Sequence, residues 1–327
     1  MKLNTERLTR TVVQKVDKQK VATYARKTKK IATYISYYLL LLSLSFVFLY
    51  PLLYMISQSL MRPQDVADAT IQWIPKVFAL ENYAIAFGAI DYWKGLLNSI
   101  WISFGSAILQ ILSCSFIGYG FARYKFPGKS LWMALLVFTF LVPPQTIVVP
   151  LYIFFSDLGW INTLFPFIVP ALFGFGLKGA LFVLIFIQFY SGLPKVLEEA
   201  ARIDGAGAFR TYWMIMFPLA RPAMIVVFLF SVVWNWNDVF QPNMYLLLPE
   251  FFNLAQNLAT FNGNASVQGM SQAQQTVSTQ AAMSMTPTLL NQIMAAVILM
   301  ILPIVILYLF VQRSFVESIE RSGISGE

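Results

Sequence analysis

The sequence contains no histidine and only one cysteine among its 327 residues. Without histidine, neither a Ser-His-Asp triad nor a histidine-ligated metal site can form within the chain. Cys114 has no second cysteine with which to form an intramolecular disulfide, and one thiolate does not make a metal site. The composition therefore excludes triad chemistry and a metal site built on histidine or cysteine, and any catalysis would need carboxylates, which the apolar stretches almost lack.

Charge is also scarce, because 12% of the residues are charged and 58% are hydrophobic, whereas about a quarter of a soluble domain is charged. Charge-free runs lie between Lys30 and Arg62 and between Lys94 and Arg123, and each exceeds the ~20 residues that cross a bilayer. We therefore predict an all-α integral membrane protein with six transmembrane helices, at residues 31–56, 96–122, 131–155, 164–190, 222–245 and 289–311.

Basic residues divide unequally between the two sides that these spans define. Nineteen lie before residue 31, in the loops 123–129 and 195–221, or in the tail, against three on the other side. Because lysine and arginine favour the cytoplasm, both termini are predicted to be cytoplasmic. The domain prediction is a basic cytoplasmic segment at 1–30, a transmembrane domain at 31–311 and a cytoplasmic tail at 312–327.

The basic N-terminal segment carries ten basic and two acidic residues, which accounts for the net charge of +8. Topology explains this excess without a nucleic-acid partner, and the one additional interaction we expect is with anionic membrane lipid. Two strings that resemble phosphate-binding loops, residues 174–179 (GFGLKG) and 128–130 (GKS), lack the required context, since the first lies in a span and the second lacks its upstream glycine. We expect no nucleotide to bind there.

The loop after the fourth span, residues 194–218, contains charges and glycines between two very apolar stretches, and we call it the EAA segment. Pro194 suits a helix start, Gly205 and Gly207 suit a helix stop, and Pro218 closes the stretch, which predicts two short helices. Periodicity places four residues on one face, with Glu198 and Glu199 elsewhere: Leu197, Ala200, Ala201 and Asp204. This pattern fits either a docking surface or an amphipathic segment on the membrane interface.

The same segment resembles the EAA signature of binding-protein-dependent ABC importer permeases. Glu199-Ala200-Ala201 is followed after three residues by Gly205, after nine more by Ile215, and then by Phe217-Pro218. The family usually has leucine where Phe217 stands. Further stretches, including LGWINT, WNWNDVFQP and QRSFVESIERSG, resemble the carbohydrate subgroup, the maltose-type second permease.

The resemblance implies that the chain forms half of a sugar or oligosaccharide pore in a bacterial or archaeal inner membrane. Its partners would be a homologous second permease, a cytoplasmic ABC ATPase dimer that binds ATP and Mg, and an extracytoplasmic sugar-binding protein. This chain would bind no cofactor itself. The EAA segment would supply coupling helices that insert into the ATPase, through Glu198, Glu199, Ala200, Ala201, Asp204, Gly205, Ile215 and Pro218.

A candidate substrate path lies in the fourth and fifth spans. Trp234, Asp238 and Gln241 recur at i, i+4 and i+7, so we expect them to share a helix face, with Asn237 beside them. They would either contact sugar or join helices by hydrogen bonds. Lys178 falls near the middle of the fourth span, where a charge usually faces a cavity or a partner. It is either a cation of the pathway or half of an ion pair, with Asp238 or with a partner subunit.

The extracytoplasmic loop 246–288 is rich in uncharged polar residues. In the permeases that this chain resembles, the corresponding loop reaches toward the docked binding protein, so the resemblance implies that the part from Asn262 to Gln280 docks that protein. The alternative function is an ion-coupled secondary transporter of a polar solute. Such transporters commonly show internal repeats and several ionisable groups within the membrane, and neither is visible here. A membrane-embedded enzyme is a more distant alternative, because no interfacial cluster of carboxylates is apparent.

Overall fold

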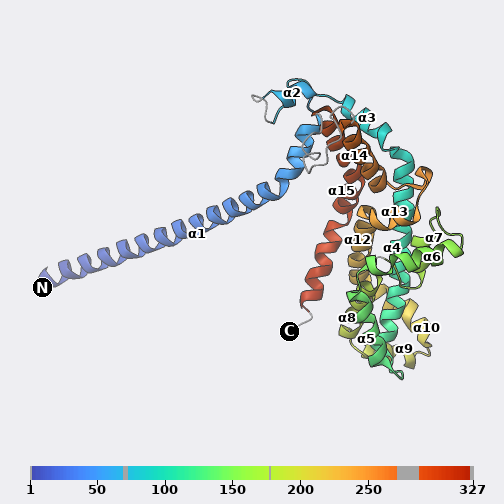
Figure 1. Ribbon diagram of the computed structural model, residues 1–327. Helices are drawn as coiled ribbons and strands as arrows, with labels where there is room; N and C mark the ends of the chain where they lie inside the picture. The colour runs from blue at the N-terminus through green and yellow to red at the C-terminus, as the bar shows by residue number, and fades with distance from the viewer. Residues whose placement is uncertain (1, 69–72, 177, 271–286, 325–327) are drawn as a thin grey trace. The chain divides into compact units, whose positions relative to one another are not determined.

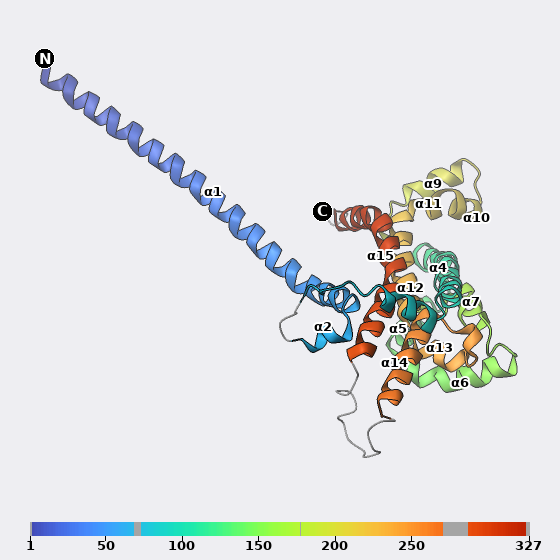
Figure 2. The same ribbon diagram turned by 90° about the horizontal axis from the view of Figure 1, so that it is seen from above.

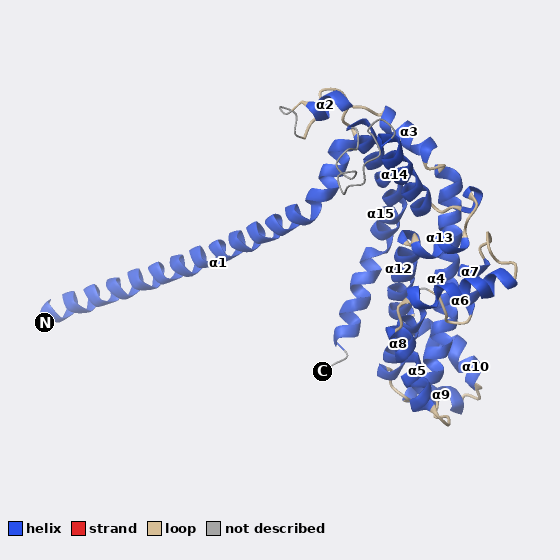
Figure 3. Ribbon diagram, viewed as in Figure 1, coloured by secondary structure: helices blue, strands red, loops and turns tan. Residues whose placement is uncertain are grey.

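The computed structural model describes residues 2–68, 73–176, 178–270 and 287–324, and these residues form helices joined by turns, with no strand among them (Figures 1 and 3). The all-α prediction is confirmed. The chain divides into two units, residues 1–57 and residues 58–327.

The first unit is almost entirely one helix, α1 (Lys2–Ser59), whose last two residues belong to the second unit. The basic segment and the first predicted span form one continuous helix, α1. Its part from Lys29 to Ser59 is long and apolar enough to cross a membrane. Large apolar side chains from Ile31 to Tyr54 are exposed around the helix. Apolar exposure on all sides suits a helix surrounded by lipid or other membrane helices.

The second unit is built around α4 (Tyr92–Arg123), which packs against α7 (Phe165–Leu172), α8 (Gly179–Gly192) and α12 (Arg221–Asn237). The remaining helices are α2 (Pro63–Ala67), α3 (Glu81–Ala89), α5 (Lys129–Leu141), α6 (Pro144–Asp157), α9 (Val196–Ile203), α10 (Ala208–Thr211), α11 (Phe217–Leu219), α13 (Phe240–Tyr245), α14 (Leu254–Met270) and α15 (Pro287–Ile324). A π-helical turn, η1 (Tyr212–Met216), joins α10 to α11, and a 3₁₀ turn, η2 (Pro249–Phe251), precedes α14.

Among the described residues, three helices are long and apolar enough to cross a membrane, and there are up to six spans if each of three bent helix pairs counts as one. Six spans therefore remain consistent with the structure. The third, fourth and fifth predicted spans, however, are not continuous helices. They are interrupted between α5 and α6, between α7 and α8, and between α12 and α13.

Each interruption has a local cause. Pro143 and Pro144 separate α5 from α6, which are bent by 98°, because proline disfavours helical backbone in the residue before it. Gly174 and Gly176 adopt φ of +72° and +120° after α7, a backbone conformation that favours glycine. Asp238 is extended after α12, and its Oδ1 accepts the amide of Phe240, the first residue of α13, at 2.9 Å.

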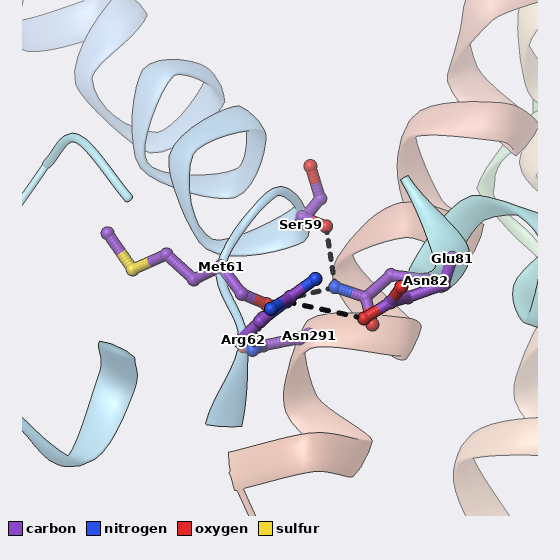
Figure 4. A network of polar contacts seen from close by, with 6 residues as sticks. All are labelled: Ser59, Met61, Arg62, Glu81, Asn82 and Asn291. Carbon is purple, nitrogen blue, oxygen red and sulfur yellow. Dashed lines mark hydrogen bonds and ion pairs between the residues drawn. The ribbon is translucent and has the colours of Figure 1, made fainter. Parts of the chain in front are cut away.

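A buried polar network joins residues 59–61 to α3 and α15 (Figure 4). The Asn82 side-chain amide donates to the carbonyl oxygens of Ser59 and Met61 at 2.9 and 3.0 Å. Asn291 donates to the Met61 carbonyl at 2.7 Å, and Arg62 pairs with Glu81 at 3.6 Å. These amides pair backbone carbonyls left free at the end of α1, where burial without a partner would be costly.

The predicted extracytoplasmic loop 246–288 is largely structured where it is described. It contains η2 and α14, so residues 262–270 are helical in backbone, whereas residues 271–280 of the predicted docking stretch lie outside the described residues. The predicted tail from residue 312 continues α15 as far as Ile324.

Candidate functional site

The EAA segment forms the two short helices that its glycines and prolines predict. Helix α9 is bent by 75° from α8, and Figure 2 shows α9, α10 and α11 gathered together. Gly205 ends α9 with φ of +78°, and the Ala206 amide donates back to the Ala201 carbonyl at 2.9 Å. This bond pattern is a helix stop that needs left-handed backbone. Gly207 was also predicted to stop the first helix, but it instead precedes the first residue of α10.

The faces of α9 differ from the predicted ones. Ala201 is buried and Leu197 is half-buried within the chain, Glu198 lies with them, and Ala200 and Asp204 are exposed. The prediction was wrong here because helical spacing alone did not reveal a buried cation for Glu198. The outward face carries residues at spacings of three and four, Val196, Glu199, Ala200 and Ile203. Ile203 is 87% exposed, which is unusual for so apolar a side chain.

The inward glutamate is held by Arg123, the last residue of α4. The Arg123 Nε atom lies 3.5 Å from Glu198 Oε1, and the two side chains are 5% and 12% exposed. Arg123 Nη2 also donates to the Leu193 carbonyl at 2.7 Å, at the end of α8. One side chain therefore fixes α9 and the α8 terminus to α4. Sequence reasoning counted Arg123 only as a topology signal.

A cluster of tyrosines fixes the second half of the EAA segment. Ser115 Oγ of α4 lies 2.7 Å from the Tyr190 hydroxyl of α8 and receives the Tyr212 hydroxyl of η1 at 3.1 Å. All three side chains are buried, and the Tyr119 ring packs against both tyrosines. Ile215 is half-buried against the same core, and Pro218 is exposed in α11. Two apolar spans and the second short helix thus meet at one hydroxyl.

A cavity of about 290 Å³ lies where the three helix breaks meet, and we call it the break cavity. Its lining includes residues from each break: Val142 and Pro144, Phe173 to Gly176 with Lys178, and Phe240 with Gln241. Irregular backbone within a membrane span is tolerated only where it is buried in protein or lines a cavity. The cavity gives the three breaks a common structural setting.

The candidate path residues fall into two groups. Lys178 and Gln241 line the break cavity, and the Lys178 Nζ atom is 5.9 Å from the centre of the Trp234 ring. Trp234 itself stacks between Phe182 and Phe230. The predicted common face of Trp234, Asp238 and Gln241 is wrong, because α12 ends at Asn237 and Gln241 belongs to α13.

Two other predicted path residues have local roles. The Asn237 side chain is exposed and donates to the Val233 carbonyl at 2.8 Å within its own helix. Asp238 accepts the amide of Phe240 at the start of α13, and in the described part of the chain it makes no ion pair with Lys178. Lys178 was expected inside a helix, but it has φ of +61° at the start of α8. The charge pattern located the residue and gave no information on the break beside it.

One buried polar chain was not predicted. Ser231 Oγ of α12 donates to Gln110 Oε1 of α4 at 2.6 Å, and Asn235 Nδ2 donates to the Ser231 carbonyl at 2.9 Å. All three side chains are buried. The recurrence of Ser231 and Asn235 at i and i+4 in an apolar helix was the available signal. Their role is to join α4 and α12, as polar residues in membrane helices commonly do.

These features define a multi-pass helical membrane protein in which breaks in the spans surround a cavity and two short helices are anchored beside the bundle. Residues 115–321, more than half of the chain, match the family of binding-protein-dependent transport system inner membrane components. The chain belongs to this family.

Curated relatives cover most of the chain. It is 28% identical to the arabinooligosaccharides transport system permease protein AraQ of Halalkalibacterium halodurans, over 86% of this chain and 93% of that protein. It is 26% identical to the sn-glycerol-3-phosphate transport system permease protein UgpE of Escherichia coli, over 89% and 96% of the two chains. The diacetylchitobiose uptake system permease protein NgcG of Streptomyces coelicolor is 27% identical and covers 86% of both chains.

A solved structure shares the fold. A chain from the crystal structure of a bacterial ABC transporter involved in the import of the acidic polysaccharide alginate matches with a TM-score of 0.67, over 86% of this chain and 95% of that one. The sequence identity is 21%, so this likeness concerns the fold alone.

Proposed function

We propose that this chain is a permease subunit of a carbohydrate ABC importer and forms half of its translocation pore. Family membership supports the importer, and the carbohydrate named in several relatives supports the substrate class. The chain would be non-catalytic, with ATP and Mg bound by a separate dimer of ATPase subunits. A second, homologous permease would complete the pore, and an extracytoplasmic binding protein would deliver the sugar.

The observation that carries this proposal is the form of α9. Its inner face is fixed by the Arg123 to Glu198 ion pair, and its outer face presents Glu199 between exposed Val196 and Ile203. An exposed apolar patch with a carboxylate at its centre is suited to a partner groove with apolar walls and a basic group. We infer that this outer face enters the cytoplasmic ATPase, and this agrees with the cytoplasmic termini that the basic residues predict.

Rigid anchoring makes the same segment suitable for transmitting force. Movement of α9 would pull on α4 through Arg123, and movement of η1 would pull on α4 and α8 through Ser115. Those helices also supply lining residues of the break cavity, among them Ile117 and Val183. ATP-driven closure of the ATPase would thereby change the cavity, which we propose lies on the solute path.

The test compares the isolated chain with the reconstituted complex. The chain alone should hydrolyse no ATP, and the complete complex should take up sugar only when the ATPase subunits and the binding protein are both present. Robust hydrolysis by the isolated chain, or sugar uptake by it in response to an ion gradient, would refute the proposal. The second of these results would support the ion-coupled alternative, which family membership does not favour.

A further inference from the structure

The break cavity has an unusual electrostatic composition for a site that would handle sugars. Its described lining contains Lys178 and no acidic residue. Lys178 is exposed and lines the cavity, and its ammonium lies over the Trp234 ring. A cation at membrane depth is costly unless a partner compensates it.

The obvious counter-ion within the chain does not serve. Asp238 Oδ1 is occupied by the Phe240 amide, and Asp238 also begins the third break rather than lining the cavity. In the described part of the chain Lys178 forms no ion pair, whereas Arg62 pairs with Glu81, Lys76 with Asp68 and Arg123 with Glu198. A cation–π contact at 5.9 Å is a weaker interaction than an ion pair with a carboxylate at hydrogen-bond distance.

The other lining groups suit a polar ring-shaped solute. The Gln241 side chain shows no hydrogen bond in the described structure, so its amide can both donate and accept. Thr139 donates its hydroxyl proton to the Leu136 carbonyl at 2.7 Å, which leaves its oxygen as an acceptor. Phe140, Phe175 and Tyr245 add aromatic surface. The volume of about 290 Å³ is near the lower limit for small-molecule sites.

From these contacts we propose that the break cavity is a solute subsite selective for sugars that carry a carboxylate or phosphate group, with Lys178 as the charge that recognises them. The inference rests on the proposed function and adds a substrate class to it. The anionic group would pair with the Lys178 ammonium, while Gln241 and Thr139 would hydrogen-bond ring hydroxyls. Binding would also remove the cost of an unpaired cation, so the preference arises from charge rather than shape.

The experiment uses the complete complex, with the second permease and the ATPase, in phosphatidylcholine nanodiscs. Two matched pairs of probes are titrated by saturation-transfer NMR: galacturonate against galactose, and glycerol 3-phosphate against glycerol. Each pair differs at a single anionic group. In the wild type we expect at least one anionic probe to bind about tenfold more tightly than its neutral partner, the order of one charge-assisted hydrogen bond.

Three variants assign the preference to one residue. Lys178→Gln should abolish it, and Lys178→Arg should retain most of it, because both lysine and arginine are cations. Lys125→Gln removes an exposed lysine from the loop between α4 and α5 and should change nothing. Equal binding of the charged and neutral probes, no binding of any probe, or a preference that survives Lys178→Gln would overturn the proposal.

Two further readouts distinguish the proposed solute from a lipid headgroup or a counter-ion in the second permease, and distinguish failure of this proposal from failure of the proposed function. If phosphatidylglycerol nanodiscs abolish the preference, a lipid headgroup occupies the subsite, and if Lys178→Gln releases the second permease, the counter-ion lies in that subunit. Either result overturns the solute subsite. Binding-protein-stimulated ATP hydrolysis is measured in the same samples. Normal stimulation without an anion preference leaves the importer assignment intact, whereas loss of stimulation in the wild type contradicts the proposed function itself.

Discussion

Arg123 and Glu198 lie 75 residues apart in sequence, and their side chains meet at 3.5 Å in a nearly buried ion pair at the junction of α4 and α9. The adjacent glutamate, Glu199, is exposed on the opposite side of the same short helix. Two neighbouring carboxylates therefore have different physical roles. Glu198 holds the helix in place, and Glu199 is available to another molecule.

Replacing Glu198 should destabilise the chain. Glu198→Ala leaves the Arg123 guanidinium buried without its counter-charge, which typically costs about 3–5 kcal/mol. The expected result is a lower thermal unfolding midpoint for the detergent-solubilised chain. Combining Glu198→Ala with Arg123→Met should recover part of the loss, because the buried charge is then removed as well. If Glu198→Ala unfolds at the wild-type temperature, the ion pair does not anchor α9.

Replacing the exposed residues of α9 should leave the stability of the chain unchanged and weaken its association with the ATPase. Glu199→Lys reverses the charge at the centre of the exposed face, and Ile203→Ser removes an apolar side chain that is 87% exposed in the isolated chain. Both should leave the unfolding midpoint unchanged and reduce co-purification of the ATPase at least severalfold, since buried contacts dominate interface energies. Asp157→Lys, a charge reversal at the end of α6, is the control. Unchanged ATPase association in both test variants would exclude this face as the contact.

Gly205 separates backbone strain from side-chain collision. A Cβ at this position would have no heavy atom within 4 Å, so the effect of substitution comes from φ of +78°. Gly205→Val should therefore cost more than the ~1–2 kcal/mol usual for left-handed backbone, because valine is β-branched. Gly205→Asn should be much milder, since asparagine visits this region. Uptake and ATPase association should follow the order Gly, Asn, Val, and equal activity of all three would show that the turn is not needed.

Ser115 is the shared partner of Tyr190 and Tyr212, so its removal should be felt by both. Ser115→Ala leaves two buried hydroxyls without their partner, at about 1–3 kcal/mol for each unpaired group. Tyr212→Phe removes one hydroxyl and leaves the Ser115 to Tyr190 bond. We expect Tyr212→Phe to retain stability and ATPase association but to lower the sugar transported per ATP hydrolysed. A normal transport ratio in both variants would remove this contact from the coupling path.

Parts of this arrangement were predictable because they depend on local sequence. Charge-free runs located the spans, and the glycines and prolines of residues 194–218 predicted two short helices with a helix stop at Gly205. The interruptions were not predicted, although Pro143-Pro144 and the glycines at 174 and 176 were visible signals. Hydropathy measures composition over a window, and a break rich in phenylalanine and glycine leaves that average nearly unchanged.

The remaining errors concern contacts between distant segments. Placing Glu198 on the inner face of α9 required knowing that Arg123 approaches from the end of α4, which no local pattern contains. The helix face assigned to Trp234, Asp238 and Gln241 assumed a continuous helix, whereas α12 ends at Asn237 and the Asp238 side chain accepts the amide of Phe240, where α13 begins. Aspartate can bond its own neighbouring backbone, and this local competition with the helix was the physical reason for the break.

The close approach of α4 and α8 provides the last prediction, and it links packing to the EAA segment. A Cβ added at Gly118 would lie 2.5 Å from Phe186 Cβ and 3.1 Å from the Ile187 amide nitrogen, whereas one added at Gly120 would meet nothing within 4 Å. Gly118→Ala must therefore separate the two helices, at about 1–3 kcal/mol for overpacking. Gly120→Ala should be neutral or stabilise slightly, because alanine favours helix over glycine.

Sugar uptake should differ between Gly118→Ala and Gly120→Ala in the same way as stability. Helix α8 leads directly into α9, and α4 carries both Arg123 and Ser115, so pushing α8 away from α4 displaces each anchor of the EAA segment. Gly118→Ala should lower thermal stability and sugar uptake together, and Gly120→Ala, two residues along the same helix, should change neither. Phe186→Leu in the Gly118→Ala background relieves bulk beyond Cβ but not the backbone contact, so it should restore little. Wild-type uptake by Gly118→Ala would mean that α4 and α8 need not approach this closely for α9 to be held where it acts.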